Sequence, residues 1–135
     1  MKRYNVIAVF TNDMKYTLMC KREKEPFKNL YNFVGGKVED DNSIREAYRE
    51  LYEETGISKC NITIKHLMDF IYYRENFELE VYYGILKHKV DLVEEINKLE
   101  WINMNENFFD YKKFAGNGNI GHIMIEIKKD LETYN

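Results

Sequence analysis

The sequence is poor in the residues that mark several classes of protein. Its 135 residues include only two cysteines and one proline. Two distant thiols, Cys20 and Cys60, provide neither a disulfide framework nor a zinc-binding pattern, so we interpret them as reduced thiols. No apolar run reaches the roughly 18 residues that a membrane span needs. The first five residues lead directly into a strand without the apolar core of a signal peptide. We therefore expect a cytoplasmic protein that makes no use of a membrane.

The charge balance and the overall composition indicate the class of protein and its possible binding partners. A net charge of −3 offers no basic surface for a nucleic-acid backbone, so we expect no nucleic-acid polymer as a partner. With 44% hydrophobic and 32% charged residues, the chain has the composition of an ordinary globular protein. Its length suits a single domain over residues 1–135, present as a monomer or a homodimer. A polyanionic small molecule would need a metal or a local basic group to bind.

Hydrophobic patterns predict strands that are interrupted by one helix and closed by another. The predicted strands cover residues 6–10, 16–21, 31–34, 62–74, 77–87 and 101–102, with a hairpin at residues 74–76. A helix is predicted over residues 43–55, where Ser43 and Glu46 have the spacing of a capping box and Gly56 follows as the C-cap. Apolar residues at helical spacing between Ile120 and Leu131 predict a second, amphipathic helix. This order indicates an α/β fold with a mixed sheet and helices packed on it.

Acidic side chains gather on one face of the helix predicted over residues 43–55. On a helical wheel, Glu46, Glu50, Glu53 and Glu54 lie opposite an apolar side formed by Ile44, Ala47, Tyr48, Leu51 and Thr55. Glu50 and Glu54 are one turn apart, so both carboxylates can reach the same point. Many amphipathic surface helices have such a stripe, and each like-charge pair costs only about 0.2–0.5 kcal/mol. Taken alone, the helix favours a solvated acidic face.

The glycine pair before this helix changes the interpretation. Gly35 and Gly36 allow the backbone to come close to a ligand, and a glycine carbonyl there can face the acidic stripe. Carboxylate oxygens, a carbonyl and water form the oxygen set that Mg²⁺ takes, usually shared with substrate phosphates. Such an ion neutralises phosphate charge and acidifies an attacking water. The segment therefore predicts a magnesium site for phosphate chemistry.

This segment resembles the Nudix box of MutT-type hydrolases. Residues 49–57, Arg-Glu-Leu-Tyr-Glu-Glu-Thr-Gly-Ile, match every specified place in the second half of the pattern G-x5-E-x7-R-E-U-x-E-E-x-G-U, where U is a bulky apolar residue. Specified residues at fixed spacing make this a strong signal. The order of predicted elements also resembles the family over nearly the whole chain. The resemblance implies an α/β/α sandwich in which the box helix and a C-terminal helix pack on a mixed sheet.

The chain departs from the family pattern in its first acid. Counted from Gly35, the pattern runs without a gap, but Asp41 stands where the family has its first Glu. Counted from Gly36, the usual register for a Gly-Gly-Lys loop, the loop is one residue short. We interpret this as a one-residue deletion with Asp41 in the Glu place. In the family this acid is the least critical one. The departure therefore concerns the geometry of the loop more than the activity.

The resemblance implies a role for each matching residue. Glu50 and Glu54 would be metal ligands, and Glu53 would be a ligand or the base that activates water. The Gly36 carbonyl would complete the inner shell, and Arg49 would hold Glu53 in place. Many family members add an acid from a loop shortly before a strand Trp. Glu95, six residues before Trp101, has that place, with Glu94 as the second candidate and a solvated loop acid as the alternative reading.

The candidate substrate-binding residues are less well defined. In some family members that hydrolyse purine nucleoside triphosphates, an Asn lies three residues before the first loop glycine, and Asn32 has this place. Its amide can donate to and accept from a purine edge, although Asn is also a common turn residue. Lys37 in the glycine loop is a further candidate. Phe114 could stack on a base and Asn117 could contact it, but a plain loop and helix N-cap explain this segment as well.

The resemblance implies a hydrolase that uses Mg²⁺, with Mn²⁺ as a substitute, to cleave the diphosphate linkage of a small nucleotide. The favoured substrate is a purine nucleoside or deoxynucleoside triphosphate, including oxidised forms, which would yield a monophosphate and pyrophosphate. ADP-ribose or a dinucleotide is the alternative substrate. Two other classes stay open: a sensor of this fold that binds a nucleotide without cutting it, and a protein-interaction module whose acidic helix is only a surface.

Overall fold

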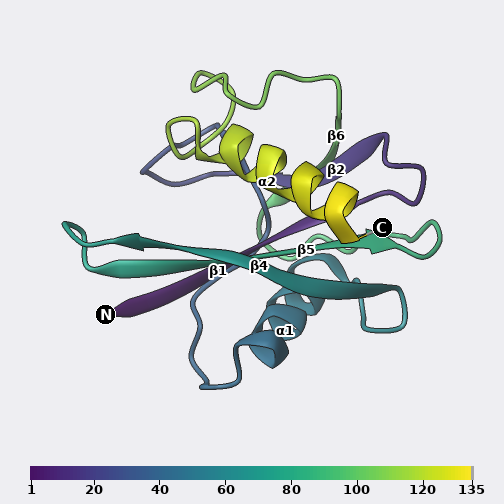
Figure 1. Ribbon diagram of the computed structural model, residues 1–135, viewed down its shortest axis with the longest axis horizontal. Coiled ribbons are helices and arrows are strands. Elements are labelled where there is room, and N and C mark those ends of the chain that lie inside the picture. The colour runs from purple at the N-terminus through teal and green to yellow at the C-terminus, as the bar shows by residue number, and fades with distance from the viewer. Residues whose placement is uncertain (135) are drawn as a thin grey trace.

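The computed structural model describes residues 1–134, so Asn135, the last residue of the predicted domain, lies outside it. Over this range the chain forms a six-stranded mixed sheet with one helix on each face (Figure 1). The strands are β1 (Lys2–Phe10), β2 (Tyr16–Lys21), β3 (Tyr31–Asn32), β4 (Ile62–Tyr72), β5 (Phe77–Leu86) and β6 (Lys98–Asn103), and the helices are α1 (Ser43–Thr55) and α2 (Asn119–Tyr134). Neither helix in this part of the chain has the length and hydropathy needed to cross a bilayer.

The sheet is built around β1. This strand pairs in parallel with β5 along its whole length, and β4 adds to β5 as an antiparallel hairpin partner. On its other side β1 meets β2 at Phe10 and Thr17 and is bridged to the glycine loop at Val34 and Lys37. Both β3 and β6 pair with β2 in antiparallel orientation. The glycine loop therefore crosses the middle of the sheet, beside the central strand.

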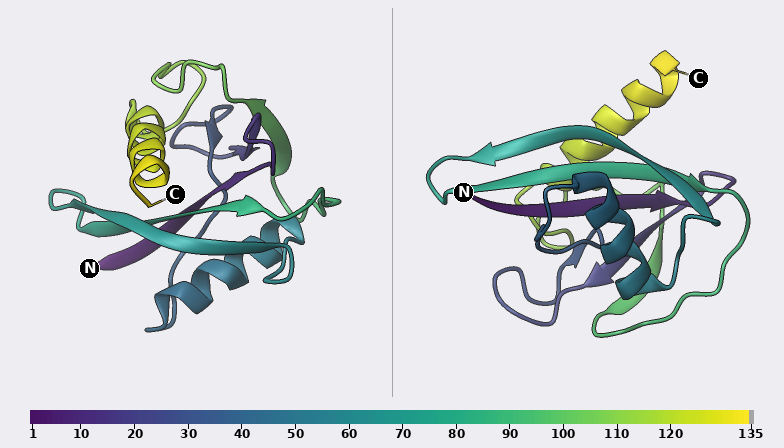
Figure 2. Two further views of the ribbon diagram at one scale, coloured as in Figure 1. Left: turned by 45° about the vertical axis from the view of Figure 1, so that its right-hand side comes forward. Right: turned by 90° about the horizontal axis from the view of Figure 1, so that it is seen from below.

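The alternation of side chains along β1 separates two hydrophobic layers. Val6, Ala8 and Phe10 are buried with Ile123 and other apolar residues of α2. The intervening residues of the strand are buried with Ala47 and Leu51 of α1. Figure 2 shows the two helices on opposite sides of the sheet. The predicted α/β/α sandwich is thus confirmed.

The structure also corrects several predicted boundaries. β1 begins at Lys2 rather than at residue 6, because its polar first half is paired with β5. β6 covers Lys98–Asn103 rather than residues 101–102, because it pairs with all of β2. The segment predicted over residues 31–34 is a strand only at Tyr31–Asn32. The hairpin between β4 and β5 is confirmed, but its turn covers residues 73–76, because β4 ends at Tyr72 rather than at residue 74. Both ends of α1 agree with the prediction.

Candidate functional site

The helix α1 carries most of the candidate site, and its ends have well-defined caps. At its C-terminus Gly56 adopts a left-handed conformation with φ of 79°, as predicted from the sequence. At its N-terminus the capping residue is Asn42, whose side chain accepts a hydrogen bond from the backbone N–H of Arg45 at 3.2 Å. The predicted capping box of Ser43 and Glu46 is wrong, because the Ser43 hydroxyl donates instead to Glu80 of β5.

Glu46 turns inward and holds the loop that precedes the helix. Its side chain is buried and accepts hydrogen bonds from the backbone N–H groups of Glu39 at 2.7 Å and Asp40 at 3.0 Å. Its expected place on the solvated acidic face is therefore wrong. Asp41, which the sequence places at the first acid of the box, is exposed instead. In this chain Glu46 is the acid that connects the shortened loop with Arg49.

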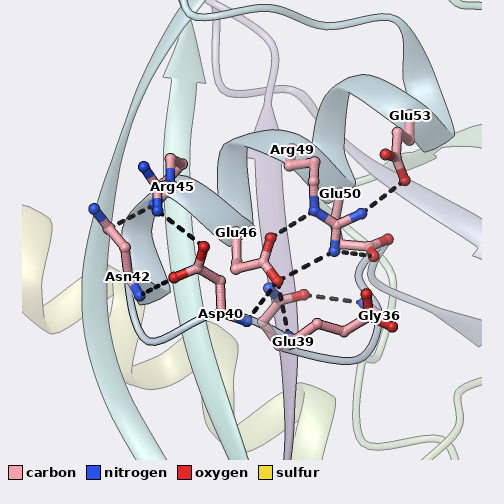
Figure 3. A network of polar contacts seen from close by, with 10 residues as sticks. Gly36, Glu39, Asp40, Asn42, Arg45, Glu46, Arg49, Glu50 and Glu53 are labelled. Atoms are coloured by element: carbon pink, nitrogen blue, oxygen red, sulfur yellow. Dashed lines mark hydrogen bonds and ion pairs between the residues drawn. The ribbon is translucent and has the colours of Figure 1, made fainter.

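Arg49 is paired with three carboxylates at once (Figure 3). Its guanidinium lies 2.5 Å from Glu46, 3.0 Å from Glu50 and 2.9 Å from Glu53. The ion pair with Arg49 is the main reason why the pKa of Glu46 is lowered, and the same contact raises the pKa of Arg49. The backbone N–H groups of residues 39 and 40 hold Glu46 in place, and Glu46 in turn holds Arg49. Arg49 therefore fixes the directions of the Glu50 and Glu53 carboxylates.

A cleft of about 230 Å³ opens beside these acids. Glu50, Glu53 and Glu54 of α1 line it together with Glu95 and its neighbours in the loop before β6. The backbone N–H of Val93 donates to the Thr55 carbonyl at 2.9 Å, which attaches this loop to the end of α1. The other loop candidate, Glu94, instead accepts a hydrogen bond from the backbone N–H of Leu99 at 2.7 Å. Of the two loop acids, Glu95 is the one that lines the cleft.

Burial and neighbouring carboxylates raise the pKa values of two acids in the cleft. The pKa of Glu54 is raised to about 7, mainly by burial; the hydrogen bond from the Gly35 backbone N–H opposes the rise, and the carboxylates of Glu50, Glu95 and Glu53 contribute to it. Burial likewise raises the pKa of Glu50, although Arg49 counteracts this. Closely spaced carboxylates with raised pKa values are the environment in which a divalent cation relieves repulsion.

The donor set fits a hard divalent cation, although the ligands are not gathered around one point. Among residues 1–134, no three acidic, imidazole or thiol side chains converge closely enough to hold a metal. The contacts with Arg49 explain this spread, since Arg49 draws one oxygen each of Glu50 and Glu53 toward itself. Glu54 points instead toward the backbone N–H of Gly35, at 3.4 Å. Their chemistry, carboxylate oxygens around one cleft, is that of a magnesium or manganese site.

The glycine loop contacts Glu50, one of the acids that line the cleft. A side chain at Gly36 would place its Cβ only 2.6 Å from the Glu50 carboxylate, and one at Gly35 would place it 2.0 Å from the Asn5 carbonyl. The contact with backbone atoms excludes a side chain at Gly35, whereas a side chain at Gly36 would displace the Glu50 carboxylate. The Gly36 carbonyl, a candidate metal ligand, accepts a hydrogen bond from the backbone N–H of Asn5 at 2.8 Å. One lone pair of this oxygen is thus engaged, and the second is available for another partner.

The sequence profile of the NUDIX domain matches residues 1–121. The chain belongs to the Nudix family. No curated protein sequence matches it at significant similarity. Many solved structures share the fold, and three of them span a range of activities.

The Nudix domain of Shewanella oneidensis NrtR, in complex with ADP ribose, has a TM-score of 0.74 and 16% identity, with 96% of this chain and 87% of that chain covered. A C. elegans Ap4A hydrolase in a binary complex has a TM-score of 0.78 and 17% identity, with 99% and 100% covered. A MutT protein from Methanosarcina mazei has a TM-score of 0.69 and 15% identity, with 96% and 94% covered. At these identities the likeness concerns the fold alone.

Three candidate substrate residues of this Nudix domain, Asn32, Phe114 and Asn117, lie in two neighbouring segments. The backbone of Tyr31 in β3 bonds to Lys113 and Ala115 on either side of Phe114, each at 2.9 Å. The segment of Asn32 therefore lies beside the segment that leads to Asn117. Phe114 itself is 1% exposed and its ring packs on Phe108, so stacking on a base would require this ring to be uncovered. Asn117 is exposed and has a positive φ of 54°.

The side of the sheet that Asn32 faces follows from its strand pairing. Asn32 is opposite Cys20 of β2, and Cys20 is opposite Leu99 of β6. Directly opposed residues project to the same face of a sheet. Leu99 lines the acidic cleft, so Asn32 projects to the face that carries the Nudix helix. Lys37 is exposed in the loop directly after Gly36.

Two parts of the site escape sequence reasoning. One is the inward role of Glu46. The other is Asn5, which is buried in β1 and bonds to Gly36 through both its backbone and its side chain. Asn is unfavourable within strands, so an Asn directly before the apolar run of residues 6–10 was the available signal. The sequence prediction began this strand one residue later, at Val6.

Proposed function

We propose that this chain is a single-domain Nudix hydrolase over residues 1–135 that cleaves the diphosphate linkage of a small nucleotide in a metal-dependent reaction. The observation that carries the proposal is the cleft that Glu50, Glu53, Glu54 and Glu95 line together. Family membership alone does not require catalysis, but all clustered acids of the box are present in this chain. Their shared cleft supports a site for Mg²⁺ or Mn²⁺ and the phosphates of a substrate.

The residues that would hold the metal are Glu50, Glu54, Glu53 and Glu95, with the Gly36 carbonyl as an additional oxygen. Arg49 bonds to Oε1 of Glu50 and to Oε2 of Glu53. It therefore leaves the second oxygen of each carboxylate for another partner. A bound divalent cation would neutralise phosphate charge and acidify an attacking water. Arg49 would keep the two carboxylates in fixed directions so that less ordering is needed on binding.

Glu53 is the favoured base in this scheme. It is about half exposed, at 49%, and it lines the cleft with one oxygen held by Arg49 at 2.9 Å. An exposed carboxylate in a fixed direction can take the proton of a water that attacks phosphorus. The phosphorus–oxygen bond to the leaving phosphate group then breaks. Glu95 faces the same cleft from its loop and is the second candidate for this role.

A purine nucleoside triphosphate is the favoured substrate, including oxidised forms, and its hydrolysis would yield a monophosphate and pyrophosphate. Asn32 supports this choice because its amide can pair with a purine edge and because it projects to the same face as the acids. Lys37 follows the glycine loop and is placed to contact a phosphate by charge. Asn117 would contact the base from the neighbouring segment, and Phe114 would stack on it only if its buried ring were uncovered.

Two alternatives have a specific basis in the structural likeness. The Ap4A hydrolase supports a dinucleotide as substrate, and the NrtR domain supports ADP-ribose. Because the NrtR domain is bound to ADP ribose, a further alternative to a hydrolase is a sensor that binds a nucleotide. A sensor would bind a nucleotide in the same cleft without releasing product.

A nucleotide panel tests the proposal. The purified protein would be assayed for phosphate and pyrophosphate release from dGTP, 8-oxo-dGTP, the other triphosphates, ADP-ribose and diadenosine polyphosphates, with Mg²⁺, Mn²⁺ or EDTA. We expect metal-dependent release of pyrophosphate from purine triphosphates. Cleavage of ADP-ribose or dinucleotides alone would favour the alternative substrates. A rise in melting temperature with one compound and no product from any would replace the hydrolase by the sensor.

A further inference from the structure

Asn5 is bonded to Gly36 in an unusual way. The backbone N–H of Asn5 donates to the Gly36 carbonyl at 2.8 Å, and the backbone N–H of Gly36 donates to the side-chain Oδ1 of Asn5 at 3.0 Å. In a regular antiparallel pair the return bond would go to the backbone carbonyl of the opposite residue. Here the Asn5 side chain takes the place of that carbonyl.

The flanking contacts show why the return bond is diverted. The bridges of Ile7 with Val34 and of Tyr4 with Lys37 keep the same register on both sides of Asn5. Between them the backbone at Gly35 presses so closely on the Asn5 carbonyl that a Cβ there would lie 2.0 Å from it. The peptide N–H of Gly36 therefore needs another buried acceptor. The carboxamide of Asn5 supplies it.

Gly36 in turn supports the acidic cleft. A Cβ at Gly36 would lie 2.6 Å from Oε2 of Glu50, so the Glu50 carboxylate rests against the Gly36 backbone. Asn5, Gly36 and Glu50 thus form a continuous series of contacts from the central strand to the cleft. A displacement of the Gly36 peptide would change both the surface on which Glu50 rests and the direction of the Gly36 carbonyl.

The chemistry of Asn5 is poorly suited to a purely structural position. The residue is 2% exposed, and its Nδ2 has no hydrogen-bond partner among residues 1–134. A buried amide without partners is unfavourable, whereas the adjacent positions on this face of β1, Ile7 and Val9, are fully apolar. An apolar side chain at position 5 would avoid this cost. The retained carboxamide therefore indicates a requirement for its Oδ1 acceptor.

We propose that Asn5 is a positioning residue for the metal site, which acts by holding the Gly36 peptide against Glu50. The inference rests on the proposed metal site and extends it to a residue outside the Nudix box. It predicts that metal affinity depends on the acceptor oxygen of residue 5. Outer residues that orient metal ligands commonly change metal affinity by about 10- to 100-fold when they are replaced.

The test is the binding of Mn²⁺ to the purified full chain, measured by electron paramagnetic resonance without any nucleotide. Asn5→Leu keeps the branched shape but removes the acceptor, and it should raise the dissociation constant by about tenfold or more. Asn5→Asp keeps an acceptor oxygen and should bind Mn²⁺ at least as tightly as the wild type. Thr17→Val is a matched control, because it removes the buried hydrogen bond of Thr17 to the Val9 carbonyl outside the cleft.

Unchanged Mn²⁺ affinity in Asn5→Leu would overturn the proposal. A loss of Mn²⁺ affinity in Thr17→Val or Asn5→Asp as large as that in Asn5→Leu would overturn it as well. If Asn5→Leu does not fold, Asn5→Ala removes the same acceptor with a smaller side chain. Wild-type Mn²⁺ affinity in Asn5→Ala would also overturn the proposal. Wild-type protein that binds Mn²⁺ but cuts no nucleotide contradicts only the proposed hydrolase. A wild type that binds no Mn²⁺ overturns both proposals.

Discussion

Glu54 offers a direct test of the electrostatic state of the cleft, because its ionisation should destabilise the metal-free protein. Its pKa is raised from 4.5 to about 7, mainly by burial. The folded state therefore binds this proton more tightly than the unfolded chain does. The stabilisation that results is complete below about pH 4.5 and is lost as the pH rises to about 7.

The size of the effect follows from the pKa change. A rise from 4.5 to about 7, at about 1.4 kcal/mol for each pH unit, corresponds to an upper limit of about 3–4 kcal/mol. The perturbation is Glu54→Gln, which removes the ionisation and keeps an oxygen that can accept the hydrogen bond from Gly35. Above pH 7 in EDTA, the free energy of unfolding of Glu54→Gln should exceed that of the wild type by up to this amount.

Urea unfolding between pH 5 and pH 8 measures the difference. In EDTA, the two free energies of unfolding should be similar near pH 5 and should separate as the pH rises. In saturating Mg²⁺ the wild type should recover the difference, because the cation stabilises the ionised carboxylate. If the free energies of unfolding of the two proteins in EDTA changed in parallel with pH, the reasoning would be refuted. A free energy of unfolding that rises with pH in the wild type relative to Glu54→Gln would refute it more strongly.

Three further substitutions test individual contacts of the site. Gly36→Ala would bring a Cβ to 2.6 Å from Glu50. Because the Glu50 side chain can move, the melting temperature should change little. The Mg²⁺ concentration for half-maximal activity should rise by about tenfold or more. Arg49→Gln leaves the buried Glu46 unpaired and should lower the free energy of unfolding in urea by about 3 kcal/mol, with partial recovery when Glu46→Gln is added. Asn32→Ala should raise KM for purine triphosphates more than for pyrimidine triphosphates in steady-state assays, and equal effects on both would speak against base recognition.

The parts of the fold that depend on local sequence were predictable. The helix α1 has the predicted limits because its apolar spacing and the glycine at position 56 act within a few residues. Its N-cap was assigned to the wrong residue because Ser43 contacts Glu80, a partner 37 residues away in the sequence. Similarly, the polar start of β1 is extended only because β5 pairs with it. Pairing between distant segments has no local signal.

The same distinction holds for the candidate site. The spacing of Glu50, Glu53 and Glu54 is a helical property, so their common direction could be predicted, and the family resemblance pointed to Glu95. A helical wheel could not show that Glu46 is covered by the loop at residues 39–40, because it treats the helix in isolation. Nor could it show that Asn5 bonds to the glycine loop, which requires the tertiary structure.

The central claim, metal-dependent hydrolysis with Glu53 as the favoured base, is tested most directly by comparing the wild type with Glu53→Gln. Pyrophosphate release from dGTP and 8-oxo-dGTP would be measured in Mg²⁺ and in EDTA, with circular dichroism and melting temperature as controls of folding. We expect release by the wild type only in Mg²⁺ and nearly none by a folded Glu53→Gln variant. Full activity of Glu53→Gln, or undiminished release in EDTA, would contradict the account.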